Sequence, residues 1–126
     1  MRAVDTNVLV RLIVRDDAAQ VRAAEQFVAR GAWVSQIVLV ETVWVLDAVF
    51  DLDPGRIALS LEMLLNHEHL SIQDPDSVAQ ALQHYRQKPA LGFSDCLVLE
   101  CARKAGHLPL GTFDKDFSRL PDTQRL

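Results

Sequence analysis

The 126-residue sequence is poor in the features that mark several whole classes of protein. It has two cysteines, Cys96 and Cys101, whose separation of five residues in a predicted helix puts them neither on one face nor within disulfide reach. No apolar stretch reaches 18 residues without a charge, and the N-terminal run is broken by Asp5 and Arg11 and lacks a cleavage-site pattern. We therefore expect buried thiols that are not oxidised, no membrane span, no signal peptide and a cytoplasmic location.

The chain also lacks a net positive charge and the common catalytic motifs. The formal net charge is -4, so net charge does not indicate a surface for polyanions, although bound cations can reverse that argument. There is no G-x-G-x-x-G, no Walker lysine motif and no serine-centred elbow, and the four histidines are scattered. With only 5 Gly and 5 Pro in a chain that is 49% hydrophobic, the composition is that of a globular domain.

What the sequence does contain is a regular alternation of short apolar strands with helices. We expect strands at 2–4, 32–35, 70–72 and 108–112, and helices from 7, over 18–30, over 36–50, after the Asp-Pro pairs at 53–54 and 74–75, and over 95–104. Pro89 to Gly92 reads as a loop, and the tail from Pro121 is left unassigned. The pattern predicts one α/β domain over 1–126, with a mainly parallel central sheet flanked by helices.

Asp5 follows the first predicted strand, in the stretch A-V-D-T-N-V-L-V. In parallel sheets, ligands bind outside the carboxyl ends of the strands, which makes Asp5 a candidate site residue. The same residue could instead cap the helix that begins near Asn7.

Glu41 breaks an even more apolar segment, I-V-L-V-E-T-V-W-V-L, which we predict to be a buried helix. A carboxylate among Val, Leu and Trp has few structural explanations and indicates function.

Three further acids stand near element ends. Asp95 opens the helix of S-D-C-L-V-L-E-C-A, where Ser94 is a candidate N-cap, and Asp114 and Asp116 follow the last strand in G-T-F-D-K-D-F. Taken singly, they read as helix-start and turn residues. Together with Asp5, crowded carboxylates would need protonation or a cation, and an all-oxygen donor set suits Mg²⁺ or Mn²⁺ rather than zinc. Such a site fits phosphodiester hydrolysis by an activated water.

These pieces match a known family. In V-D-T-N-V-L-V-R-L, V-E-T-V-W-V-L, F-S-D-C-L-V-L-E-C-A and G-T-F-D-K-D-F, in this order and over nearly the whole chain, the sequence resembles the PIN-domain ribonucleases, and most closely the VapC-type toxins of toxin–antitoxin pairs.

The resemblance implies that Asp5, Glu41 and Asp95 form an acidic triad with Asp114 as fourth acid, holding one or two Mg²⁺ or Mn²⁺ ions for RNA cleavage. Asp116 is an additional metal-ligand candidate. The expected supporting polar residues are Thr6, Asn7, Ser94 and Thr112. The family also implies a homodimer and inhibition by a small antitoxin protein.

Six basic residues are candidates for RNA contacts: Arg11, Arg15, Arg86, Lys88, Arg103 and Lys104. Two other functions remain open. One is a receiver-like signalling module in which Mg²⁺ assists phosphorylation of an aspartate, although the first strand here ends in one acid rather than two. The other is an inactive PIN fold that serves only as a binding scaffold.

Overall fold

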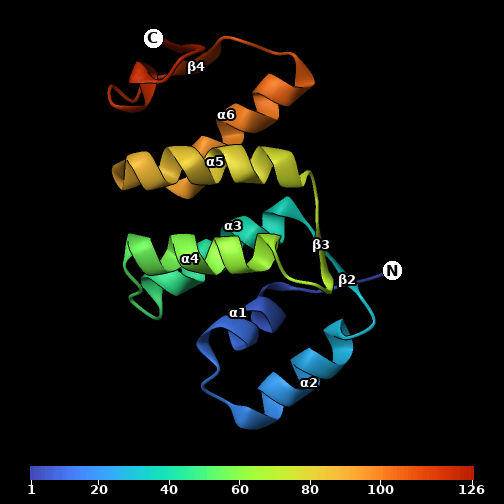
Figure 1. The fold of residues 1–126 in the computed structure, drawn as a ribbon. Helices are drawn as coiled ribbons and strands as arrows, with labels where there is room; N and C mark the ends of the chain where they lie inside the picture. Colours follow the sequence, from blue (N-terminus) through green and yellow to red (C-terminus); the bar gives the residue numbers. More distant parts are fainter. The chain divides into compact units, whose positions relative to one another are not determined.

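The computed structural model describes residues 1–126, which divide into two compact units, Met1–Pro75 and Asp76–Leu126. The elements of the first unit are β1 (Arg2–Ala3), α1 (Thr6–Val14), α2 (Ala18–Val28), β2 (Ala32–Val34), α3 (Gln36–Ala48), α4 (Pro54–Leu65) and β3 (Leu70–Ile72) (Figure 1). Those of the second are α5 (Pro75–Gln87, which starts at the boundary), the short 3-10 helix η1 (Pro89–Leu91), α6 (Phe93–Ala105), β4 (Leu110–Thr112), the 3-10 helix η2 (Phe117–Arg119) and β5 (Thr123–Arg125).

The first unit is built on a parallel sheet of order β1-β2-β3. Along β2, Ala32 and Val34 are buried while Trp33 between them is exposed, which is the alternation expected of a strand with one covered face. Helix α1 packs against both α2 and α3, and α3 against α4. Helical crossovers between parallel strands therefore carry the chain through this unit.

Local capping explains where its helices begin. Asp17, Ser35 and Asp53 each accept a hydrogen bond from the backbone N–H three residues on, and Pro54 follows Asp53 at the first helical position. The second Asp-Pro pair also precedes a helix, α5, and there Asp74 takes a positive φ of 46°. Both Asp-Pro pairs thus mark the start of a helix, α4 and α5, as predicted.

The second unit has a two-stranded parallel sheet, β4-β5. Its core is formed by side chains of α5 and α6, with the rings of Tyr85 and Phe93 in an edge-to-face contact at 6.3 Å between centroids. Helix α6 ends at Ala105, and its C-cap is Gly106, whose φ of 83° is readily available to glycine.

The α/β class with parallel strands is confirmed, and the assignment of 1–126 to a single domain stays a prediction. None of the six α-helices has the length and apolar character needed to cross a bilayer.

Several predicted details are wrong. The first strand is Arg2–Ala3 rather than 2–4, and both of its residues are exposed, whereas Val4 after it is buried. Only the Leu110–Thr112 part of the strand predicted at 108–112 forms, and the tail contains the unpredicted strand β5, which pairs with it.

The two helices that carry predicted ligands also differ from expectation. Helix α6 starts at Phe93, two residues early, and its N-cap is Gly92 rather than Ser94. Of the two cysteines on α6, which do not form a disulfide, Cys96 is buried as predicted and Cys101 is exposed. Helix α3 is not buried all round: its covered face consists of Leu39, Thr42 and Leu46.

Candidate functional site

Asp5 lies between β1 and α1 and is the N-cap of α1. Its Oδ1 accepts a hydrogen bond from the Val8 N–H at 3.4 Å, and the residue is exposed. The capping interpretation is therefore confirmed. It leaves the ligand interpretation open, because the capping bond engages Oδ1 and does not involve Oδ2.

The two polar residues after Asp5 occupy different environments. Thr6 is buried at the first position of α1, whereas Asn7 is exposed and lines a cavity between α1 and α2 together with Arg11 and Phe27. Leu9 is fully buried and fixes this helix to the core. The supporting roles of Thr6 and Asn7 at a metal site stay predictions.

Glu41 is exposed in the middle of α3, contrary to the prediction of burial. Its neighbours one turn away are also exposed: Ile37 at 78% and Trp44 at 64% of their full surface. An apolar helix that packs along one stripe leaves its other apolar residues uncovered, and Glu41 lies on that uncovered face. Its carboxylate is accessible in the first unit.

Asp95 is the third residue of α6, next to Ser94, and both are exposed. The pKa of the Asp95 carboxyl is raised above its ordinary value, chiefly by partial burial of the group and secondly by the negative charge of Asp114. The carboxylate of Asp114, in the loop after β4 of the same unit, therefore repels the carboxylate of Asp95.

Asp114 is held in a tight turn after β4. Its Oδ1 accepts the N–H groups of Asp116 at 2.9 Å and Phe117 at 3.1 Å, while its own N–H donates to Thr112 Oγ1 at 3.0 Å. The turn interpretation of Asp114 is confirmed, and Thr112 positions this residue through its backbone.

Asp116 precedes the short helix η2 and caps none of its N–H groups with its side chain. Its Oδ1 lies 3.9 Å from Arg119 Nη1. Both side chains are exposed, so this long ion pair contributes little, and the role of Asp116 as a metal ligand stays a prediction.

The predicted ligands are divided between the two units: Asp5 and Glu41 belong to the first, and Asp95, Asp114 and Asp116 to the second. Neither unit by itself groups three or more His, Cys, Asp or Glu side chains around a possible metal position. The four-acid site stays a prediction, supported within the second unit by the Asp95–Asp114 interaction.

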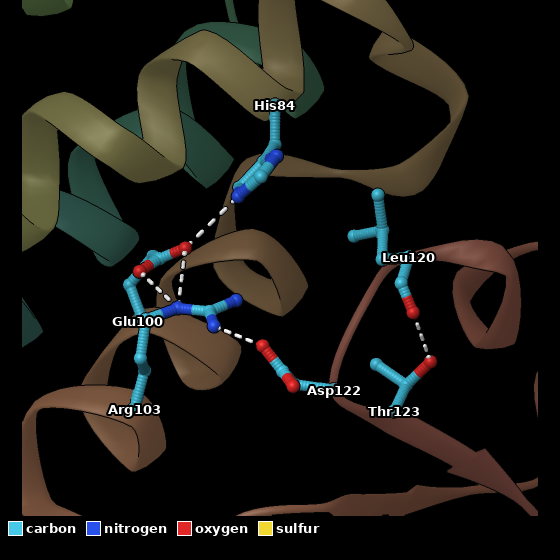
Figure 2. Close-up of polar contacts among 6 residues, drawn as sticks. All are labelled: His84, Glu100, Arg103, Leu120, Asp122 and Thr123. Carbon is cyan, nitrogen blue, oxygen red and sulfur yellow. Dashed lines mark hydrogen bonds and ion pairs between the residues drawn. The ribbon is translucent and has the colours of Figure 1, made fainter.

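The sequence analysis missed Glu100, the one charged side chain that is buried, at 5% exposure. Its Oε1 lies 2.9 Å from His84 Nε2 on α5, and its Oε2 accepts a hydrogen bond from Arg103 Nε at 3.1 Å (Figure 2). Arg103 also pairs with Asp122 just before β5. The signal was present in the sequence, since Glu100 follows the apolar run L-V-L just as Glu41 follows V-L-V.

Four of the six basic residues expected to contact RNA are held in ion pairs. The pairs are Arg11–Asp16, Arg15–Glu25, Arg103 with Glu100 and Asp122, and Lys104–Asp76. Arg86 lies in the last turn of α5, and Lys88 is half-buried before η1. A paired cation must give up its carboxylate to reach a phosphate, so these four are poorer RNA-contact candidates than the sequence indicated.

Comparison with known proteins gives one match. The family model described as PIN domain matches residues 2–122, which is nearly the whole chain. No curated protein matches the sequence. Proteins with PIN domains are generally nucleases that act on nucleic acid and use divalent metals.

Proposed function

The chain belongs to the PIN-domain family, and we propose that it is an endoribonuclease that depends on Mg²⁺ or Mn²⁺. The observation that carries this proposal is the family match over residues 2–122, which includes every acid of the four motifs. No feature of the structure favours the receiver-like module or the inactive scaffold. The acids of the four motifs that we propose as ligands are all exposed.

The donor set fits a hard divalent cation. All four proposed ligands, Asp5, Glu41, Asp95 and Asp114, are carboxylates and all are exposed. The pKa of Asp95 is raised chiefly by partial burial and secondly by the charge of Asp114, and a bound cation would offset the second cause. We include Asp116 as a fifth oxygen donor.

Hydrogen bonds within the chain would orient the carboxylates that we propose as metal ligands. The capping bond of Asp5 and the turn bonds of Asp114 fix each carboxylate through one oxygen, Oδ1, and leave Oδ2 outside these bonds. Thr112 fixes the Asp114 backbone, and Ser94 lies beside Asp95 in the first turn of α6. A bound divalent cation supplies an activated water and offsets charge on the scissile phosphate.

The test is cleavage of a structured RNA pool by the purified chain in Mg²⁺ or Mn²⁺, beside Asp5→Asn and Asp95→Asn. The wild type should cleave in metal and fail in EDTA, and both variants should leave the RNA intact. Equal cleavage by all three proteins, or cleavage in EDTA, would show that the assignment is wrong.

We further propose that the enzyme is the toxin of a toxin–antitoxin pair, acts in the cytoplasm as a homodimer and is inhibited by a small antitoxin protein. The resemblance to VapC-type toxins supports the toxin role. The exposed apolar side chains of Ile37 and Trp44 on α3 support association with another protein chain. Expression should arrest growth of a host, and co-expression of a short upstream reading frame should restore it. A monomer by light scattering would contradict the dimer without affecting the nuclease proposal.

A further inference from the structure

Asp122, the residue before β5, is bonded to two other elements of the second unit. Its side-chain Oδ2 pairs with Nη1 of Arg103 in the last turn of α6 (Figure 2). Its backbone O accepts a hydrogen bond from the N–H of Leu110, the first residue of β4, at 2.9 Å. Asp122 therefore links the end of α6 to the start of β4.

The Arg103 end of this link is held in place by Glu100. Arg103 Nε lies 3.1 Å from Oε2 and 3.4 Å from Oε1 of Glu100, and Oε1 in turn lies 2.9 Å from Nε2 of His84 on α5 (Figure 2). An ion pair near the surface usually contributes little, because two long side chains must lose freedom to form it. Here the buried Glu100 already orients the guanidinium, so Asp122 meets a donor that is fixed in advance.

The backbone at Asp122 favours a different residue. Its φ is 67°, in the left-handed region that glycine adopts without the steric cost of a side chain. Gly106, the C-cap of α6, has such a conformation and is glycine. The carboxylate at position 122 is therefore explained by its pairing with Arg103 rather than by the turn.

The position of Asp114 depends on β4. Asp114 lies two residues beyond this strand, and its N–H donates to Oγ1 of Thr112, the last residue of β4, at 3.0 Å. Because β4 has three residues and spans only about 7 Å, a shift of Leu110 would be carried along it to Thr112. The tie between α6 and Leu110 thus bears on where Asp114 lies relative to Asp95, the third residue of α6.

We propose that Asp122 and Arg103 are positioning residues, which tie β4 to α6 and so hold the Asp114 carboxylate at the metal site. This inference rests on the proposed nuclease function and deepens it by naming residues that act on the site without touching metal or RNA. It gives Arg103 a role other than the RNA contact expected from the sequence, since its guanidinium is engaged by two carboxylates.

Asp122→Gly tests the link with the least disturbance of the backbone, because glycine accepts the left-handed φ and only the carboxylate is lost. Calorimetry of the full chain should show Mn²⁺ binding weakened about tenfold, as when a residue that orients a ligand is removed. With an RNA that wild type cleaves, in saturating Mg²⁺, kcat should fall about tenfold while KM stays within about twofold. Asp122→Asn, which keeps a side-chain oxygen for Arg103, should lie between wild type and Asp122→Gly.

Asp51→Gly is the matched control. Asp51 also has a left-handed φ, 53°, and is exposed, but it lies between α3 and α4 in the first unit and makes no ion pair. The substitution makes the same change in backbone freedom and in charge, so Mn²⁺ affinity, kcat and KM should keep their wild-type values. Urea unfolding of both glycine variants measures stability separately. A merely structural role of Asp122 would lower the unfolding midpoint without changing Mn²⁺ affinity.

Arg103→Lys tests the link from its other end. Lysine keeps a positive charge next to Glu100 but cannot donate from one planar group to two carboxylates. It should therefore reproduce the losses in Mn²⁺ affinity and kcat of Asp122→Gly. The double variant should be weaker than either single variant by no more than about twofold, because both substitutions break one link.

Three results would overturn the inference. The first is wild-type Mn²⁺ affinity and kcat in Asp122→Gly or in Arg103→Lys, whatever their stability. The second is a double variant whose loss is the product of the two single losses, which would mean independent roles. The third is a higher KM with unchanged kcat in Arg103→Lys, which would make Arg103 an RNA contact. If wild type binds Mn²⁺ and cleaves RNA, each of these removes only the positioning role; if wild type does neither, the proposed function fails with it.

Discussion

Helices α3 and α6 each carry a glutamate directly after a run of apolar residues, yet the two carboxylates have opposite environments. Glu41 of α3 is exposed among uncovered apolar side chains, and Glu100 of α6 is buried at 5% exposure. Glu100 has partners on both sides, His84 and Arg103, whereas the residues one turn from Glu41 offer none.

The difference shows that the burial of a charged residue follows its partners rather than its sequence neighbours. A carboxylate enters a core only when cations or N–H donors accompany it, because an unpaired buried charge costs several kcal/mol. Glu100 meets this condition within its unit, so it is explained by structure. Glu41 has an accessible carboxylate, so burial does not explain it, and its role as a metal ligand is a proposal.

The largest expected effect comes from Glu41→Gln, which should lower RNA cleavage at least about 100-fold, because an amide is a poor ligand for a hard cation. The free energy of unfolding should change by less than about 0.5 kcal/mol, since the side chain is exposed. Cleavage rates and urea unfolding measure the two quantities. Asp47→Asn, an exposed acid on the same helix, should leave both unchanged. Normal cleavage by Glu41→Gln would remove Glu41 from the site.

Glu100→Ala should have the converse effect and destabilise the protein by about 2 kcal/mol, because His84 and Arg103 lose a buried acceptor. Arg103 keeps its pairing with Asp122, which limits the loss. Urea unfolding gives the value. Val98→Ala, at an exposed position of α6, is the matched control and should be near neutral. A loss no greater than that of the control would show that the Glu100 contacts contribute no stability.

The smallest effect concerns Asp95, whose pKa is raised in the folded chain by burial and by Asp114. A raised carboxyl pKa means that the folded state binds the proton more tightly, so stability falls as pH rises from the unfolded value through the folded one. In EDTA at pH 7, Asp95→Asn should therefore unfold at slightly higher urea than wild type, and the difference should vanish below the unfolded pKa.

Asp76 gives the opposite sign and serves as the control. Its pKa is lowered chiefly by a hydrogen bond from Lys104, so its contribution is present above the unfolded pKa and is lost as pH falls through the folded one. Asp76→Asn should slightly destabilise the protein at pH 7. A destabilising Asp95→Asn at that pH would contradict the repulsion between Asp95 and Asp114.

Most of the fold could be predicted because its signals are local. Caps such as Asp53-Pro54, the turn acids and the apolar alternation of 32–34 depend on residues close in sequence. What failed depends on distant partners: the unpredicted β5, for example, exists because it pairs with β4.

The same limit applies to the candidate site. The motifs named Asp5, Asp95 and Asp114 as candidates, and the structure places them after strands or near a helix start as expected, while their roles as ligands stay predictions. Whether an acid in an apolar segment is buried could not be predicted from the sequence of α3 alone, because burial depends on which face of the helix packs against the rest of the unit. The ion pairs that engage Arg103 and Lys104 likewise involve residues 19 and 28 positions away.

The central proposal is that Asp5, Glu41, Asp95 and Asp114 are ligands of a divalent metal, and Mn²⁺ binding to the full chain tests it most directly. Calorimetry or electron spin resonance would measure the Mn²⁺ affinity of wild type, Asp5→Asn and Asp95→Asn. Each variant removes one proposed ligand, Asp5 of the first unit or Asp95 of the second. We predict that each substitution weakens Mn²⁺ binding at least about tenfold. Wild-type affinity in Asp5→Asn together with loss in Asp95→Asn, or the reverse, would remove one of these acids from the ligand set and contradict the proposal.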